Sequence, residues 1–232
     1  MRKKQLAVLL VLLTIAPALS GCAGVAWFFA VMQPPKKKDA LFDLPDDKRV
    51  LVLAEDRMQM GGSESVQREL TQWLNHALLR QKLVREVVPY SALAALRAKT
   101  PDFHRLHITE VGQKLGAEVI IYVNIRTFAL KSNQSDVLWD AHSEVAVKVI
   151  QCPAGIKEGK ARLWPLHSPL GHTVSHKRAP KTDTSPGYEE KLARTLVVET
   201  ADRIAKLFYT HELKGIEAWE RKPTGGDPRI VQ

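Results

Sequence analysis

Apolar and polar positions recur along the chain with two different periods, and these periods predict an ordered series of strands and helices. Lys48 to Leu53 is apolar on both faces, which is typical of a buried strand. Val66 to Leu78 carries apolar residues at helical spacing, so it predicts an amphipathic helix with Ser63 as its N-cap. Glu189 to Tyr209 has the same period and predicts a second long helix.

The strongest strand signal lies in the middle of the chain. Glu118 to Leu130 begins apolar on both faces and alternates from Asn124 onward. After a polar turn at 131–135, a second alternating run extends from about Val137 to Cys152, and the two runs predict an antiparallel hairpin. Shorter elements are predicted as strands at 85–90, 161–166 and 171–177 and as helices at 91–98 and 101–115, the last ended by Gly116.

This order of elements predicts the fold class and the domain organisation. Strands and helices alternate and then give way to the hairpin, so we expect an α/β fold of the α+β sandwich type, with a mixed sheet and helices packed against it. A single domain is expected over 48–210. The tail, 211–232, contains Gly225, Gly226 and Pro228 among polar residues and is predicted to be flexible.

The amino terminus has the pattern of a bacterial lipoprotein signal peptide. The positive segment Arg2–Lys4 precedes an apolar core at Leu6–Leu13, and LSGC follows at 19–22. In this class the cysteine thiol is alkylated by diacylglycerol, because its thiolate is a good nucleophile, and the chain is cut before it. We therefore predict removal of residues 1–21 and lipid on Cys22. An ordinary signal peptide or an uncleaved anchor helix is the alternative.

Residues 22–47 are predicted to form a lipidated, membrane-proximal linker. Ala23 to Met32 is apolar again, and Lys36–Lys38 adds a basic segment that suits anionic headgroups or, equally, a solvated linker. Ala23 is not the aspartate that retains such proteins at the inner membrane in some bacteria. We therefore expect a periplasm-facing protein of the cell envelope, held through the lipid on Cys22, with the outer membrane favoured over the inner one.

Charge and cysteine content limit the kinds of partner and the role of the second cysteine. The formal net charge is +9 and falls to +6 when Arg2–Lys4 leave with the leader. The excess is spread out and not interleaved with aromatic residues, so no nucleic acid is expected as a partner, whereas a binder of peptidoglycan or another anionic envelope polymer is an alternative function. With Cys22 lipidated, Cys152 has no intrachain partner and is expected to be a buried small hydrophobe.

Candidate chemistry is sparse. His167, His172 and His176 lie within ten residues, and three imidazoles are able to bind zinc, so a metal-dependent hydrolase is a second alternative. Their spacing matches no established ligand motif. Gly61-Gly62 lacks the remaining residues of a phosphate loop or a dinucleotide fingerprint, and no Gly-x-Ser-x-Gly elbow occurs. We therefore predict no catalytic residues and no cofactor.

From Lys48 to Tyr209 the chain resembles a group of envelope lipoproteins. The resemblance lies in the strand RVLVLAED, the Gly-Gly loop with the helix after it, and GQKLGAEVIIYV, in which a helix ends at Leu-Gly-Ala before a long strand. The group includes the curli secretion lipoprotein, the lipoprotein activators of penicillin-binding proteins and the amino-terminal domain of the Tol-system propeller protein. It shares no catalytic residues, and the resemblance implies a binding role such as pore assembly, enzyme activation or envelope bridging.

The prediction for function combines these observations. We expect a membrane-anchored envelope lipoprotein that acts as a non-enzymatic interaction or assembly module, with an envelope protein or a second copy of itself as partner. Trp73, on the apolar face of its helix, and Trp139 and Trp164, beside the long strands, are expected to be buried rather than to form a partner surface.

Overall fold

The computed structural model describes residues 36–57, 59, 61–132, 135–152 and 161–213. The helices are α2 (Glu64–Arg80), α3 (Tyr90–Lys99), α4 (Ile108–Lys114) and α6 (Tyr188–Ala205), with a 3-10 turn, η1, at Phe103–Arg105. The strands are β1 (Lys37–Lys38), β2 (Arg49–Glu55), β3 (Glu86–Val87), β4 (Val119–Ser132), β5 (Ser135–Gln151), β6 (Arg162–Trp164), β7 (His172–Lys177), β8 (Lys181–Thr182) and β9 (His211–Glu212). Cys22 and the predicted signal peptide lie outside the described residues.

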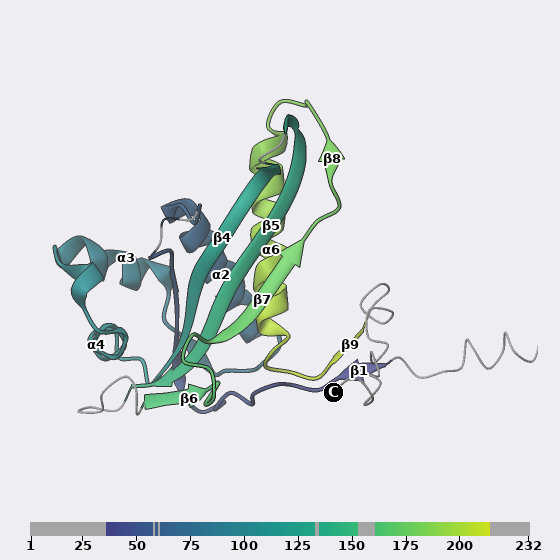
Figure 1. The fold of residues 1–232 in the computed structure, drawn as a ribbon. Coiled ribbons are helices and arrows are strands. Elements are labelled where there is room, and N and C mark those ends of the chain that lie inside the picture. Colours follow the sequence, from purple (N-terminus) through teal and green to yellow (C-terminus); the bar gives the residue numbers. More distant parts are fainter. Residues whose placement is uncertain (1–35, 58, 60, 133–134, 153–160, 214–232) are drawn as a thin grey trace, which may run out of the picture. The chain divides into compact units, whose positions relative to one another are not determined.

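A mixed sheet forms the centre of the fold (Figure 1). Strands run in the order β3-β2-β4-β5-β6, and β7 and β8 also pair with β5. The β3-β2-β4 part is parallel and every pairing made by β5 is antiparallel. The predicted α+β sandwich with a long antiparallel hairpin is therefore confirmed.

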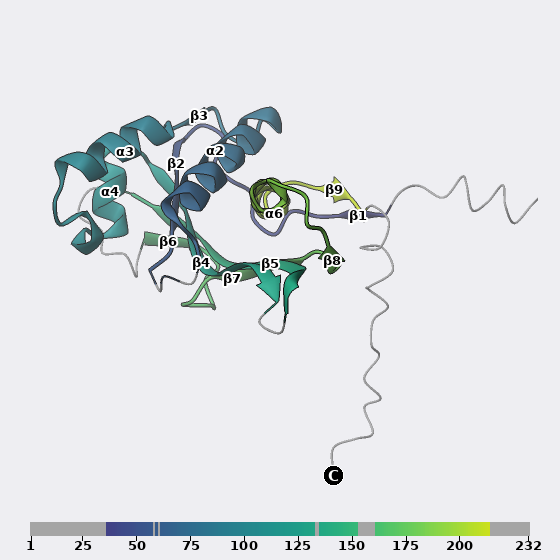
Figure 2. The ribbon, with the colours of Figure 1, turned by 90° about the horizontal axis from the view of Figure 1, so that it is seen from above.

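Helices cover the two faces of the sheet unequally, as the view from above shows (Figure 2). On one face α2 and α6 enclose a core that includes Val52, Leu74 and Ile121, all fully buried. On the other face α3 and α4 cover only the β2–β4 side, around Leu53 and Ile120. Complete burial of each such side chain stabilises the fold by about 1.5–3 kcal/mol.

Local signals place the ends of the main elements where the sequence predicts them. The Ser63 hydroxyl accepts a hydrogen bond from the Val66 amide, 3.4 Å away, and so caps α2. Gly116 has φ +65° after the end of α4, and the Ala117 amide donates to the carbonyl of Gly112 at 2.8 Å. This left-handed stop turns the chain directly into β4, as predicted.

Two predicted helices differ from the structure. The segment 101–115 is not one helix, because the 3-10 turn η1 ends at Arg105 and α4 begins only at Ile108. Ser91 is predicted to cap the helix that follows it, but the helix begins at Tyr90, so Ser91 lies in its first turn and Pro89 takes the N-cap position without a side-chain cap. Proline at a helix start loses no hydrogen bond, which explains why it is tolerated there.

Two compact units are present, and each is described by itself. One comprises Asp39–His211 and holds the main sheet and all the described helices. In the other, the Leu213 amide donates to the carbonyl of Lys36 at 2.8 Å, next to the pairing of β1 with β9. Within the described residues, no helix combines the length and the apolar composition needed to cross a bilayer.

Candidate functional site

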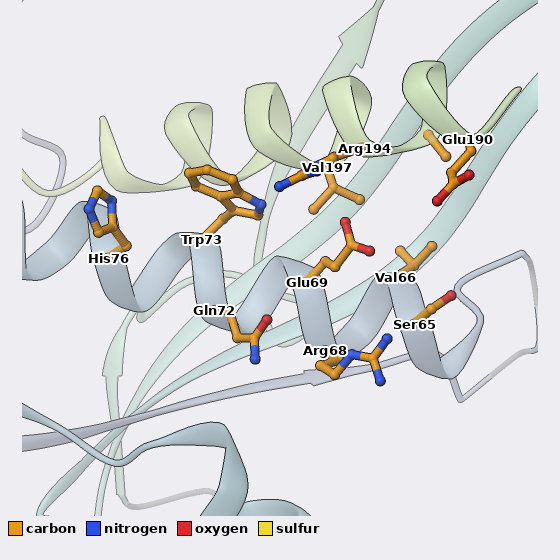
Figure 3. Close-up of a pocket in the computed structure, with 11 residues that line it drawn as sticks. Ser65, Val66, Arg68, Glu69, Gln72, Trp73, His76, Glu190, Arg194 and Val197 are labelled. Carbon is orange, nitrogen blue, oxygen red and sulfur yellow. The ribbon is translucent and has the colours of Figure 1, made fainter. Parts of the chain in front are cut away.

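A groove runs between α2 and α6 on the outer side of the two helices (Figure 3). We call it the α2–α6 groove; its volume is about 750 Å³. The lining residues are Ser65, Val66, Arg68, Glu69, Gln72, Trp73, His76, Glu190, Ala193, Arg194 and Val197. The two helices run in the same direction, so the groove follows both from their first turns toward their carboxyl ends.

The floor of the groove is apolar. Val66 and Val197 are buried between the helices and the sheet, at 9% and 2% exposure, and belong to the main core. Trp73 is only half-buried: its ring packs against that core and meets the His76 ring edge-on at 6.1 Å between centroids. The prediction that Trp73 is buried is therefore only partly correct, since one side of the indole remains accessible from the groove.

The rim of the groove carries charges of both signs. Glu69 and Glu190 lie toward the amino-terminal end of the two helices, and Arg194 lies between them and Trp73 (Figure 3). Arg68 also lines the groove, but its side chain lies on the side of α2 away from α6, so it does not belong to the charges between the two helices (Figure 3). Within the described part of the chain, these four side chains make no ion pair with one another or with other described residues. They are therefore free to interact with a ligand.

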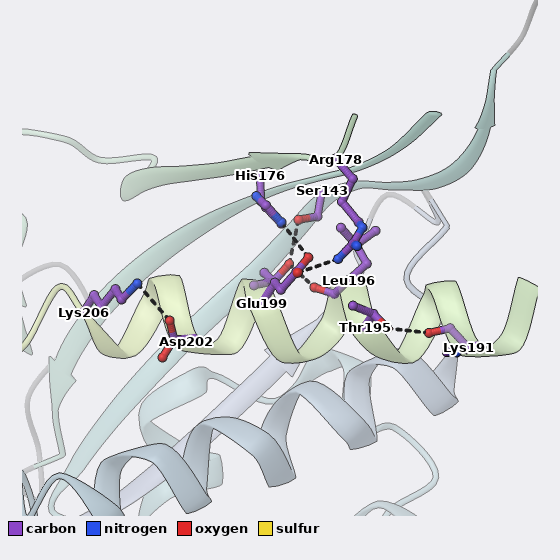
Figure 4. A network of polar contacts seen from close by, with 10 residues as sticks. Ser143, His176, Arg178, Lys191, Thr195, Leu196, Glu199, Asp202 and Lys206 are labelled. Atoms are coloured by element: carbon purple, nitrogen blue, oxygen red, sulfur yellow. Dashed lines mark hydrogen bonds and ion pairs between the residues drawn. The ribbon is translucent and has the colours of Figure 1, made fainter. Parts of the chain in front are cut away.

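A polar network fixes α6, one wall of the groove, to the sheet (Figure 4). Glu199 accepts hydrogen bonds from the Arg178 guanidinium and from Nε2 of His176, the latter at 2.8 Å. Next to it, the hydroxyls of Ser143 and Thr200 are 2.7 Å apart, and the Thr200 hydroxyl also donates to the carbonyl of Leu196. Polar groups of β5 and β7 thus meet those of α6 and hold its orientation.

Glu199 is ionised more readily than an ordinary glutamate. Burial raises the pKa of this carboxyl, but the hydrogen bonds and positive charges of Arg178 and His176 outweigh burial and leave the pKa below its usual value. Ser143 is only 2% exposed, and its hydroxyl is engaged with Thr200. The network therefore fits a structural role in positioning α6.

Replacing Glu199 by glutamine is expected to lower the free energy of unfolding by about 1 kcal/mol at neutral pH, because a half-exposed, charge-assisted interaction is lost. The pKa of Glu199 is lower in the folded state than in the unfolded state, where it is about 4.3. The stabilisation is therefore fully present at pH values above the unfolded-state pKa and is lost as the pH falls through the folded-state pKa. Urea unfolding of wild type and E199Q should therefore converge in acid. A gap that persists or widens in acid contradicts this account, and E189Q, an exposed change on the same helix, is the control.

The three candidate metal-binding histidines are not brought together. His167 is exposed, the His172 ring packs on Trp164 at 5.1 Å between centroids, and His176 binds Glu199. His172 and His176 face the same side of β7 but are four residues apart, which is about 13 Å at the rise of a strand. Among the described residues, no cluster of three histidine, cysteine or carboxylate side chains is placed to hold a metal ion.

Cys152 is buried, as predicted. It is 9% exposed and forms no disulfide, and burial raises the pKa of its thiol to about 11. The fit around it is close, because a Cβ added to Gly112 of α4 would lie 2.6 Å from the Cys152 sulfur. The thiol thus packs α4 against β5 and is protonated at neutral pH, which suits a core residue.

Basic side chains on the open face of the hairpin are paired with acidic ones. Arg126 lies 3.3 Å from Glu144, and Lys177 lies 3.0 Å from Asp140. Lys148 lies over the Tyr122 ring at 5.9 Å. This face therefore presents mixed charge, whereas a polymer of repeated anionic groups would favour an unpaired basic stripe.

The groove was missed at the sequence level, although one signal for it exists. Glu69, Trp73 and His76 follow one another at spacings of four and three, so they form a line along the edge of the apolar face of α2. Glu190 and Arg194, which line the groove from the other helix, lie more than a hundred residues later in the sequence. No local pattern indicates that α6 packs beside α2.

Comparisons with known proteins leave the family open. No protein-family model matches the chain, and no curated protein matches it significantly. Similar solved structures include the PelC dodecamer from Paraburkholderia phytofirmans, 10% identical over 74% of this chain and 96% of that one with a TM-score of 0.35. They also include lipoprotein GNA1162 from Neisseria meningitidis, 13% identical over 68% of this chain and 98% of that one with a TM-score of 0.38. Likenesses this distant assign no function.

Proposed function

We propose that this chain is a lipid-anchored protein of the bacterial envelope whose folded domain is a non-enzymatic interaction module, binding an amphipathic helix of another envelope protein in the α2–α6 groove. The observation that carries the proposal is the groove itself, with a half-buried tryptophan on its floor and unpaired charges on its rim. The anchor is the lipid predicted on Cys22. Periplasm-facing attachment, with the outer membrane favoured, belongs to the same proposal.

The shape of the groove favours a helix as occupant. A channel between two helices that run in the same direction accepts a third helix, whose side chains fit between theirs. From Val66 to His76 the groove follows α2 for ten steps of helical rise, or about 15 Å, which corresponds to roughly three turns of a bound helix.

The charges define the chemistry of that helix. Opposite Glu69 and Glu190 it would carry basic side chains, and opposite Arg194 an acidic one. Against Trp73 it would place an apolar side chain, because partly buried aromatic residues in grooves contribute much of the binding energy of interfaces. The order basic, acidic, apolar along about three turns distinguishes this partner from a generally acidic or basic protein.

Reversing the charge of Glu190 is expected to weaken the complex about tenfold or more, since a basic side chain of the partner would then face a lysine. Glu64→Lys is the matched control: Glu64 and Glu190 both lie in the first turn of a helix, but only Glu190 lines the groove. The measurement is quantitative pull-down of the tagged, lipidated protein from detergent-solubilised envelopes.

The predicted result is one defined protein that is retained by wild type and E64K and lost by E190K. Equal retention by both variants contradicts the groove as the binding site. Recovery only of the protein's own second copy contradicts the proposed occupant, because the domain would then be a self-assembling module.

A further inference from the structure

Two of the most exposed large hydrophobic side chains in the described part of the chain lie in one short loop. We call residues 165–171, between β6 and β7, the apolar loop; Leu166 and Leu170 are both 69% exposed. Single exposed leucines are ordinary, but two in one seven-residue loop mark a candidate apolar contact surface.

The apolar loop is held by its own hydrogen bonds. The Ser168 hydroxyl donates to the carbonyl of Gly171 at 2.8 Å, and the Gly171 amide donates back to the carbonyl of Ser168 at 3.1 Å. The Arg162 guanidinium donates to the same Ser168 carbonyl at 3.4 Å. The backbone that carries the two leucines is therefore ordered before any partner binds, so little further ordering of the loop opposes binding.

The base of the loop lies where the chain enters the domain from its amino terminus. Trp164, the last residue before the loop, has its ring centroid 6.2 Å from that of Phe42 and 6.2 Å from that of Phe208. One residue before Phe42, the Leu41 amide donates to the carbonyl of Leu207 at 2.7 Å, and Leu41 is itself 42% exposed. The entering chain and the apolar loop thus share one end of the sheet (Figure 1).

The remaining exposed large hydrophobic residue of the described part, Leu79, is 43% exposed and lies near the end of α2. After α2 the chain returns to the start of β2, where the Arg85 amide donates to the carbonyl of Asp46 at 3.0 Å. Because β2 and β4 both begin at this end of the sheet, Leu79 lies at the same end as the apolar loop. All four exposed large hydrophobic residues of the described part therefore lie toward this end of the sheet.

We propose that the apolar loop inserts Leu166 and Leu170 into the lipid bilayer, as a second membrane contact beside the lipid on Cys22. The inference rests on the proposed lipid anchor. Sixteen residues separate Cys22 from Asp39, the first residue of the domain's compact unit, so the tether alone would allow at most about 60 Å between the domain and the membrane. A projecting apolar loop at the tether's end fits a fluid bilayer surface, whereas a protein partner would need a matching pocket.

This contact would also orient the α2–α6 groove. The carboxyl ends of α2 and α6 lie at the membrane end, so His76 would be closer to the bilayer than Ser65 and Glu190. The groove would open into the periplasm with its acidic end pointing away from the membrane. A partner helix would then have a defined direction as well as a defined order of charges.

The test places a fluorescent probe on the loop of the full, lipidated chain. L166C is labelled with an environment-sensitive dye and incorporated into vesicles of phosphatidylethanolamine and phosphatidylglycerol that contain no other protein. Labelling is selective, because Cys22 is blocked by lipid and the buried Cys152 thiol has a pKa of about 11. T184C is the matched control: Thr184 is exposed and follows β8, which pairs with β5 near Trp139, toward the far end of the hairpin.

If the loop inserts by about 5–10 Å, the emission of the dye on L166C should shift to the blue, and lipids spin-labelled near the top of the acyl chain should quench it strongly. The dye on T184C should show neither effect. Adding Leu170→Ser should reduce the quenching. A water-like, unquenched L166C probe on vesicle-bound protein overturns the proposal, as does a shift that occurs only after envelope proteins are added. The measurements on vesicles without other proteins leave the groove proposal untouched, since no partner protein is present in them. An unlipidated mature chain, detected by mass, removes the anchor on which both rest.

Discussion

Trp73→Ala weakens the complex with the partner helix at least about thirtyfold while the domain remains folded: this is the expected result for the largest single contact of the α2–α6 groove. Truncation of a central aromatic residue at an interface costs 2 kcal/mol or more, which is about a thirtyfold loss of affinity. Because only part of the Trp73 side chain is buried, the free energy of unfolding should fall less than for a core residue such as Leu74.

Two variants separate binding from stability in this experiment. Trp73→Phe keeps an aromatic floor and should retain most of the binding. Leu79→Ala, on the same helix but outside the groove, should retain all of it. Pull-down and urea unfolding are measured on the same preparations. Wild-type binding by W73A, or equal losses for W73A and L79A, would show that the groove does not hold the partner.

Cys22→Ala is expected to change the mature protein more than any other single substitution. In the wild type we expect intact-mass spectrometry to show a chain that begins at residue 22 and carries diacylglycerol and an additional acyl group. Without the thiol no thioether forms, so the variant should carry no lipid and should not be cut before residue 22. The acyl chains that give stable anchoring are then absent.

Cys152→Ala is the control for this measurement. Cys152 is buried against α4 and remains a thiol of high pKa, so its replacement should alter neither processing nor lipid content. A wild-type chain that keeps residues 1–21, or is cut elsewhere and carries no lipid, would contradict the lipoprotein assignment and indicate an anchor helix or an ordinary signal peptide.

The elements that the sequence predicted well are those whose apolar period is long and unbroken. Val66 to Leu78 lies within α2, with Ser63 as the predicted cap, and the runs on either side of 131–135 form the β4–β5 hairpin. The ends of short segments depend on local chemistry that the apolar period does not reveal. Between Pro101 and Leu115, a 3-10 turn interrupts what the apolar spacing indicated as one helix.

The candidate site was harder to predict because it depends on contacts between distant segments. Glu199, His176 and Arg178 meet only because β7 pairs with β5 and α6 then crosses both strands. The extended backbone of β7 keeps His172 and His176 apart, so the shared metal site considered as an alternative from their closeness in sequence is not formed by these two residues. Trp73 has the helical spacing of a core residue. One side of its ring nevertheless stays accessible, because it faces the groove between α2 and α6, and the spacing within α2 does not reveal where α6 lies.

Cross-linking in intact cells identifies the protein that occupies the α2–α6 groove. A photoreactive benzophenone side chain replaces His76, which is exposed and lines the groove, and in a second strain replaces Ala95, which is exposed on α3. We expect one defined envelope protein to be cross-linked at position 76, through a segment with the order basic, acidic, apolar, and we expect this product to be lost when Trp73→Ala is added. The same product from position 95, or a product at 76 that persists in the Trp73→Ala background, would contradict this expectation.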